Sequence, residues 1–150
     1  MSREILPFRP EDAELINLRE MDARTLAFVP DLARLIRNLA RGGPSFTAWA
    51  DGQPACIGGV LILTDWMGEA WLFTSPLVER YPLWFHKAVR QYLRLIIAEN
   101  NLRRVQANVF VDNETSLRWT PRLGFVEEGP LWAYGPGGED YTRFARLRVN

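Results

Sequence analysis

The sequence is poor in the residues that bind metal ions and form cross-links. Its 150 residues include one cysteine, Cys56, one histidine, His86, and one lysine, Lys87. A single cysteine excludes an intrachain disulfide, and one cysteine with one histidine is too few for a structural zinc site. Because Cys56 lies in an apolar segment, we expect a buried thiol and not a nucleophile. We expect His86 to be exposed on the polar face of a helix.

An excess of charge of either sign is also missing. Eighteen Lys and Arg residues balance eighteen Asp and Glu residues, so the formal net charge is zero. A protein that binds nucleic acid over much of its surface normally carries a basic excess, which disfavours that function class. One local basic patch has two possible interpretations, a solvated face or a contact for phosphate or nucleic acid. It consists of Lys87, Arg90 and Arg94, with Arg103 and Arg104 just beyond.

Long hydrophobic runs are absent as well. The longest uncharged apolar stretch, Pro54 to Thr64, is too short to span a bilayer, and residues 1–10 lack the apolar core of a signal peptide. We therefore expect no membrane partner, no secretion through a signal peptide, and a reducing cytoplasm. Hydrophobic residues make up 47% and charged residues 24% of the chain, which predicts one globular domain over residues 1–150.

Hydrophobic periodicity and turn residues predict an order of strands and helices. The clearest helix follows Pro82, where Phe85 and Val89 share one apolar face. Gly124 is placed to end a short helix in the left-handed conformation. Gly58-Gly59 interrupts a strand as a bulge or a close backbone approach. The predicted strands are 5–10, 45–50, 55–64, 69–75, 105–111 and 125–127, with a hairpin of 131–134 and 141–147; the predicted helices begin at residues 10 and 30 and cover 82–100 and 115–123. A strand-helix-strand unit inside a mostly antiparallel sheet indicates a three-layer α+β domain.

One stretch of the sequence carries a family resemblance. Starting from Asn113, Ser116 follows three residues later, Trp119 six residues later, and Gly124-Phe125 at eleven and twelve. This spacing, together with the order of the elements, resembles the GNAT superfamily of acyl-CoA N-acyltransferases. The resemblance implies a three-layer α/β/α GNAT-like fold with a mixed, mostly antiparallel sheet.

A shorter motif is similar to a phage branch of the same superfamily. It consists of Trp71-x-x-Thr74-Ser75, an arginine-bearing helix and the strand that leads to Asn113. That branch includes small internal virion proteins of short-tailed phages. The resemblance implies a phage or prophage protein in the host cytoplasm or the phage particle, with other virion proteins as partners. Six tryptophans also suit a protein-contact surface or an oligomer.

The segment that would bind the cofactor departs from the family pattern. In GNAT proteins, backbone N–H groups of a glycine-rich loop hold the pyrophosphate of acetyl-CoA at the start of the long helix. The matching segment begins at Arg80, and Leu83 and Phe85 stand where the family has small residues. Pro82 removes one N–H donor. These changes predict a crowded, degenerate site and no bound cofactor.

The groups that would transfer protons are also altered. Thr120 stands where many GNAT enzymes carry the tyrosine that protonates the CoA thiolate. Tyr81 and Tyr134 are the tyrosines that remain candidates for that role. Glu69 and Asp112 are the candidates for a general base, each weighed against a solvated or capping carboxylate.

Two functions therefore stay open. The first is a virion-assembly or structural accessory that acts through protein contacts. The second is an active N-acetyltransferase that moves an acetyl group from acetyl-CoA to an amine. For the second, the resemblance assigns acetyl-CoA contacts to Phe73, Thr74, Ser75, Arg80 and Asn113, leaves Glu69 and Tyr134 as candidate catalytic residues, and implies no metal.

Overall fold

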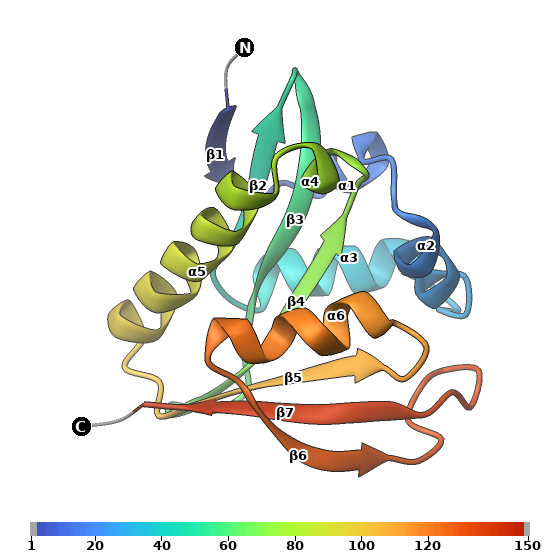
Figure 1. Cartoon of the computed structure of the whole chain (residues 1–150), viewed down its shortest axis with the longest axis vertical. Helices are drawn as coiled ribbons and strands as arrows, with labels where there is room; N and C mark the ends of the chain where they lie inside the picture. Colours follow the sequence, from blue (N-terminus) through green and yellow to red (C-terminus); the bar gives the residue numbers. More distant parts are fainter. Residues whose placement is uncertain (1–2, 149–150) are drawn as a thin grey trace.

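The computed structural model describes residues 3–148, which form a seven-stranded sheet with helices on both faces (Figure 1). The strand order is β1-β2-β3-β4-β5-β7-β6. Every neighbouring pair is antiparallel except β4 with β5, which are parallel. The strands are β1 Arg3–Pro7, β2 Ser45–Ala50, β3 Gln53–Ile62, β4 Met67–Thr74, β5 Arg104–Phe110, β6 Val126–Leu131 and β7 Tyr141–Leu147. The predicted α+β class with a mixed, mostly antiparallel sheet is confirmed.

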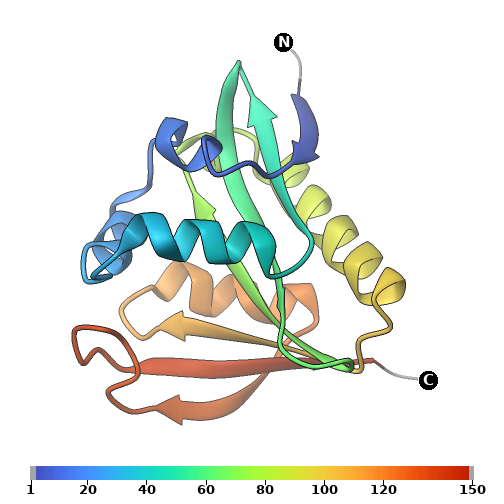
Figure 2. The same cartoon turned by 180° about the vertical axis from the view of Figure 1, so that it is seen from behind.

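The helices form the two outer layers. One face of the sheet carries α5 and α6, and the other carries α1, α2 and α3 (Figures 1 and 2). The α-helices are α1 Asp12–Leu15, α2 Glu20–Leu26, α3 Leu32–Arg41, α4 Leu77–Arg80, α5 Pro82–Glu99 and α6 Glu114–Trp119, and a 3₁₀ turn, η1, covers Thr120–Leu123.

The alternation of side chains along β4 explains why both faces are covered. Ala70 and Leu72 pack into the core beneath α5, whereas Trp71 and Phe73 pack into a second cluster beneath α1 and α3. Successive side chains of a strand point to opposite faces, so a strand that is apolar on both faces needs a helical layer on each side.

The parallel pair β4 and β5 is joined by the long crossover helix α5. The two strands pair only over Met67–Ala70 and Arg104–Ala107. Beyond Ala70 and Ala107 they diverge, which leaves a gap in the sheet (Figure 1). This gap is the feature of the fold that positions the site.

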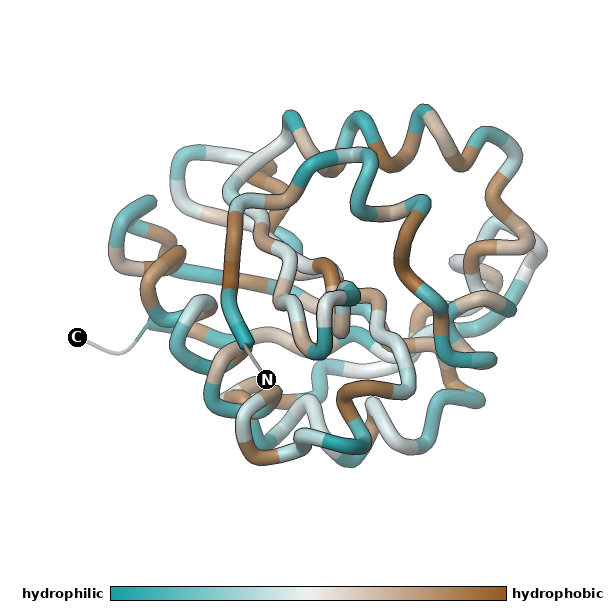
Figure 3. The backbone as a smooth tube through the Cα atoms, turned by 90° about the horizontal axis from the view of Figure 1, so that it is seen from above, coloured by the Kyte–Doolittle hydropathy of each residue, from teal (hydrophilic) through white to brown (hydrophobic). Residues whose placement is uncertain are grey.

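No helix among the described residues is long and apolar enough to cross a membrane. In a view from above, hydrophilic and hydrophobic residues alternate along the helices, as expected for helices with one buried face (Figure 3).

Two predicted elements are wrong at the ends of the chain. The chain after Pro10 forms two helices and not one, because Ile16 is extended with ψ 131°. Of the predicted strand 131–134 only Leu131 is extended, as the last residue of β6. Trp132 and Ala133 form a turn, in which Ala133 has φ 52°. The strand predicted at 125–127 is confirmed as the start of β6, which continues through Gly129 and Pro130 on the edge of the sheet.

The glycine pair in β3 serves close packing and not a bulge. The β2–β3 ladder continues through Gly58 and Gly59, and its register shift lies at Ala48 and Trp49. A Cβ at Gly59 would lie 2.4 Å from the carbonyl oxygen of Pro44. The predicted close backbone approach is therefore confirmed, and the alternative of a bulge is wrong.

Candidate functional site

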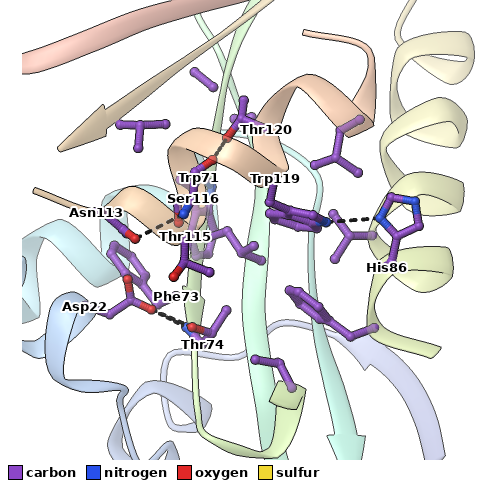
Figure 4. Close-up of a pocket in the computed structure, with 18 of the residues that line it drawn as sticks. Asp22, Trp71, Phe73, Thr74, His86, Asn113, Thr115, Ser116, Trp119 and Thr120 are labelled. Atoms are coloured by element: carbon purple, nitrogen blue, oxygen red, sulfur yellow. Dashed lines mark hydrogen bonds between the residues drawn. The ribbon is translucent and has the colours of Figure 1, made fainter. Parts of the chain in front are cut away.

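A cavity of about 770 Å³ occupies the gap between β4 and β5 (Figure 4). Its walls come from the diverging strands, from the first turns of α5 and from α6 with η1. Trp71–Thr74 of β4, Asn108–Phe110 of β5, Phe85 and His86 of α5, and Asn113, Ser116, Trp119 and Thr120 are among the residues that line it.

The edge of β4 that faces the gap carries backbone groups. The N–H and C=O of Thr74 both bind residues of the α2 region, on the side away from β3, whereas Ser75 N–H donates to Ala55 O of β3 over 2.8 Å. Because backbone polar groups alternate direction along a strand, the N–H and C=O of Leu72 point into the gap as those of Thr74 do. Beyond its pairing with β5, β4 therefore presents a donor and an acceptor to the cavity.

Residues at the start of α2 dock onto the end of β4. Thr74 donates its N–H and its hydroxyl to Asp22 Oδ2, each over 2.7 Å, and Arg19 N–H donates to Thr74 O over 2.8 Å. Burial raises the pKa of Asp22 above its usual range, although both hydrogen bonds from Thr74 and the charge of Arg19 lower it. Asp22 is thus a carboxylate that lines the cavity and holds a proton more readily than a solvated one.

The first turn of α5 has two backbone donors without a helical partner. Phe85 N–H makes the first bond of the helix, to Tyr81 O over 3.0 Å, and Pro82 has no N–H. The N–H groups of Leu83 and Trp84 therefore have no partner within the helix, and no side chain caps them. Leu83 is 76% exposed and Phe85 is buried against α6, and both line the cavity at this end of α5.

Aromatic side chains connect α5 to α6 across one wall of the cavity. The rings of Phe85 and Trp119 are stacked with centroids 5.0 Å apart, and Trp119 Nε1 donates to His86 Nδ1 over 3.0 Å (Figure 4). Burial lowers the pKa of His86, and the charges of Arg122 and Arg90 lower it further. The expectation of an exposed His86 is wrong, because its ring is half-buried and faces α6.

The two candidate catalytic residues, Glu69 and Tyr134, are connected by one side chain. Asn108 Nδ2 donates to Glu69 Oε1 over 2.9 Å and to the Tyr134 hydroxyl over 3.0 Å. Arg143 Nε donates to Asn108 Oδ1 over 2.6 Å, which fixes the orientation of the amide. Gln106 Nε2 is a second donor to Glu69 Oε1, over 3.1 Å. This cluster lies beside the base of the gap, on the face opposite α5.

The structure brings only some of the predicted cofactor residues together. Phe73, Thr74 and Asn113 line the cavity. Arg80 pairs instead with Asp51, and Ser75 is buried, where its Oγ accepts the N–H of Leu77. Neither Arg80 nor Ser75 is among the residues that line the cavity.

The other singled-out side chains have structural partners. Asn113 is the N-cap of α6, since Oδ1 accepts Ser116 N–H, and the Thr120 hydroxyl is buried and donates to Ser116 O. Tyr81 donates its hydroxyl to Asp51.

Cys56 is fully buried, and burial raises its thiol pKa to about 12, so the predicted structural role is confirmed. Asp112 forms an ion pair with Arg24, 3.1 Å apart, and residues 3–148 contain no group of three potential metal-ligating side chains.

A smaller cavity of about 470 Å³ adjoins the first on the α2 side. The two share several lining residues, and both are bordered by α2 and by the start of α6. The residues common to both cavities are Arg19, Met21, Glu79, Asn113 and Thr115.

Solved structures with the same architecture include acetyltransferases. Ard1 from Thermoplasma volcanium superposes with a TM-score of 0.80 at 19% identity, covering 100% of both chains. A putative phosphinothricin N-acetyltransferase gives 0.76 at 15% identity, covering 99% of this chain and 100% of the other. A GNAT-family acetyltransferase from Bacillus anthracis gives 0.73 at 18% identity, covering 98% and 95%. The chain has the GNAT acetyltransferase fold. No protein-family model and no curated protein sequence matches it.

Sequence reasoning missed two residues of this GNAT-fold site. Asp22 stands 52 positions before Thr74, and Asn108 stands 39 positions after Glu69. The only local signal for Asn108 was that it alternates with apolar residues in β5, as Gln106 also does. Nothing in the neighbouring sequence marked Asp22, which resembles an ordinary acidic residue in the first turn of a helix.

Proposed function

We propose that this protein binds acetyl-CoA in the gap between β4 and β5 and transfers the acetyl group to an amine. The observation that supports this most directly is the open gap itself, with the N–H and C=O of Leu72 facing into it. A chain of amides, such as the pantetheine arm of CoA, is recognised by an exposed strand edge through such backbone groups. The GNAT fold alone would not support the proposal, since one fold hosts many functions.

The start of α5 fits the phosphate groups of acetyl-CoA. The free N–H groups of Leu83 and Trp84 lie at the positive end of an 18-residue helix. Arg118 and Arg122 border the same cavity, and neither is in an ion pair among residues 3–148. Two donors and two free cations replace the glycine-rich loop expected from the family.

The Glu69–Asn108–Tyr134 cluster suits the transfer chemistry. In the reaction, the amine nitrogen forms a bond to the thioester carbonyl carbon, the carbon–sulfur bond breaks, and the thiolate takes up a proton. Tyr134 is half-exposed and its hydroxyl accepts a hydrogen bond from Asn108, which lines the cavity. It is a candidate donor of that proton, replacing the absent tyrosine at Thr120. Asn108 holds the carboxylate of Glu69 and the hydroxyl of Tyr134 on one amide, so both belong to one network.

A role in virion assembly, a phage origin and contacts with virion proteins stay predictions from the sequence. The same holds for nucleic-acid binding by Lys87, Arg90 and Arg94, whose side chains are exposed on α5.

Thermal unfolding with and without acetyl-CoA tests the proposal. Acetyl-CoA at a hundred times its dissociation constant stabilises the folded chain by about 2.7 kcal/mol, which raises the midpoint by roughly 5 to 10 °C. Ala107→Phe fills the base of the gap and abolishes the shift, whereas Val126→Phe on the exposed edge strand β6 retains it. An absent shift in the unmodified chain, or an equal shift in Ala107→Phe, contradicts binding in the gap.

A further inference from the structure

We infer that Asp22 is the group that accepts the proton of the acceptor amine. This inference rests on the proposed function and adds a catalytic residue that lies on α2, outside the strands that build the gap. It also restricts the acceptor to amines that arrive protonated and must lose a proton before they attack.

The placement of Asp22 leaves one of its oxygens available. Both hydrogen bonds from Thr74 go to Oδ2. Oδ1 accepts no hydrogen bond from the described residues. The buried polar atoms that lack a partner among these residues do not include Oδ1, so this oxygen is exposed to solvent. Asp22 also lines the cavity (Figure 4). Oδ2 thus anchors the side chain to β4, while Oδ1 remains accessible at the cavity.

The alternative carboxylate is less well placed to receive a proton. Glu69 lies where β4 still pairs with β5, opposite Gln106, and it is not among the residues that line the cavity. Asp22 stands at the opposite end of the gap, where the adjoining smaller cavity provides a second opening for an amine.

The surroundings of Asp22 suit a proton acceptor. Burial raises its pKa, against the effects of the Thr74 hydrogen bonds and of Arg19. The charge of Arg19 is shared with Glu79, 3.0 Å away, and that of Arg24 on the same helix with Asp112. A carboxylate with a raised pKa takes a proton from an ammonium group more readily than a solvated one.

The proposed step balances in atoms and charge. The ammonium group of the acceptor gives one proton to Asp22 Oδ1 and becomes a neutral amine. The nitrogen lone pair then forms the carbon–nitrogen bond and the carbon–sulfur bond breaks. The thiolate takes its proton from the Tyr134 hydroxyl, and the second proton of the nitrogen restores that hydroxyl. The proton held by Asp22 leaves to water, so each turnover releases one amide, one thiol and one proton.

Two substitutions distinguish this catalytic role from a purely structural one. Asp22→Asn keeps an oxygen that can accept the hydrogen bonds of Thr74 but cannot take up a proton. Thr74→Val removes the hydroxyl donor and keeps the backbone N–H, so it weakens the anchor and leaves the carboxylate. Release of CoA thiol is followed from pH 5 to 9 with acetyl-CoA and three probes: ethylamine, spermidine, and a tripeptide with a free N-terminus.

We expect Asp22→Asn to lower kcat by about 10² to 10⁴ fold, with an acetyl-CoA thermal shift like that of the unmodified chain. In the unmodified chain, kcat should fall at low pH as Asp22 becomes protonated, and this acidic limb of the pH profile disappears in Asp22→Asn. It moves to higher pH in Thr74→Val, because the lost hydrogen bond had lowered the pKa of Asp22. A structural role predicts neither change in the pH profile.

The outcomes separate this inference from the proposed function. If the unmodified chain acetylates a probe and Asp22→Asn keeps its rate and its acidic limb, the inference is overturned and the proposed function stands. If the unmodified chain releases no thiol with any probe, both are contradicted. If it also shows no thermal shift with acetyl-CoA, the failure already lies in binding.

Discussion

Thr74 donates its backbone N–H and its hydroxyl to the same oxygen of Asp22, each over 2.7 Å. The contact joins the end of β4 to α2 at the place where β5 has already turned away. It satisfies backbone groups that a neighbouring strand would otherwise bind, and it fixes α2 at the mouth of the cavity. The edge that remains open is therefore short and centred on Leu72.

The stability of the fold should depend on pH through Asp22. Its pKa is raised in the folded chain, so its contribution to stability is complete below the pKa of the unfolded chain, near 3.8. That contribution is lost as the pH rises through the raised, folded-state pKa. In urea unfolding from pH 3 to 8, the stability of Asp22→Asn relative to the unmodified chain should increase with pH across this window. A constant difference between the two proteins would contradict the raised pKa.

The contact between His86 and Trp119 should weaken in acid. The pKa of His86 is lowered from 6.5 in the folded chain, so its stabilising effect is present above pH 6.5 and is lost as the pH falls through the folded-state value. Protonated Nδ1 can no longer accept the hydrogen bond from Trp119 Nε1. The thermal midpoint should therefore fall more steeply between pH 7 and 5 than in His86→Gln. Equal slopes would show that this contact does not titrate.

Much of the fold follows from local patterns in the sequence. Apolar periodicity marked α5, Gly124 marked the end of η1 with φ 94°, and the spacing from Asn113 indicated the family of folds. Asn113 also caps α6, as an Asn before a helix predicts. These features depend on neighbours within a few residues, so the sequence was sufficient to predict them.

The site depends on contacts that local patterns do not encode. Leu83 was expected to crowd the start of α5, and its crowding of a ligand stays a prediction, because the residue is largely exposed and also lines the cavity. Asp22 meets Thr74, and Asn108 meets Glu69, only through the register of the strands and the docking of α2. Neither distance could be predicted without the assembled sheet.

Asn108 should affect the reaction more than its neighbour Gln106. Both side chains donate to Glu69 Oε1, but only Asn108 also reaches Tyr134. We expect Asn108→Leu to lower kcat for amine acetylation by about 10² fold, since misplaced catalytic groups cost that much, and Gln106→Leu to lower it less. Steady-state kinetics with spermidine measures both. A larger loss in Gln106→Leu would show that the connection to Tyr134 is unimportant.

Gly59 should be intolerant of any side chain. A Cβ there would lie 2.4 Å from Pro44 O and 2.7 Å from Ser45 Cβ. We expect Gly59→Ala to destabilise the fold by about 1 to 3 kcal/mol, measured by urea unfolding, because the backbone of β2 must move. Adding Ser45→Gly should restore only part of the loss, because it removes the contact with Ser45 Cβ but leaves those with Pro44 O and with the Cα of residue 45, 2.8 Å away. An unchanged midpoint in Gly59→Ala would contradict the close approach of the two strands.

The central claim is that acetyl-CoA occupies the gap between β4 and β5, and amide chemical shifts test it residue by residue. A titration of the ¹⁵N-labelled chain with acetyl-CoA should move the backbone amide signals of Leu72, Leu83 and Trp84, which are the donors assigned to the ligand. The amide of Arg94, on the exposed face of α5, should stay unchanged. Shifts confined to the exposed face of α5, or no shifts at saturating acetyl-CoA, would contradict the account.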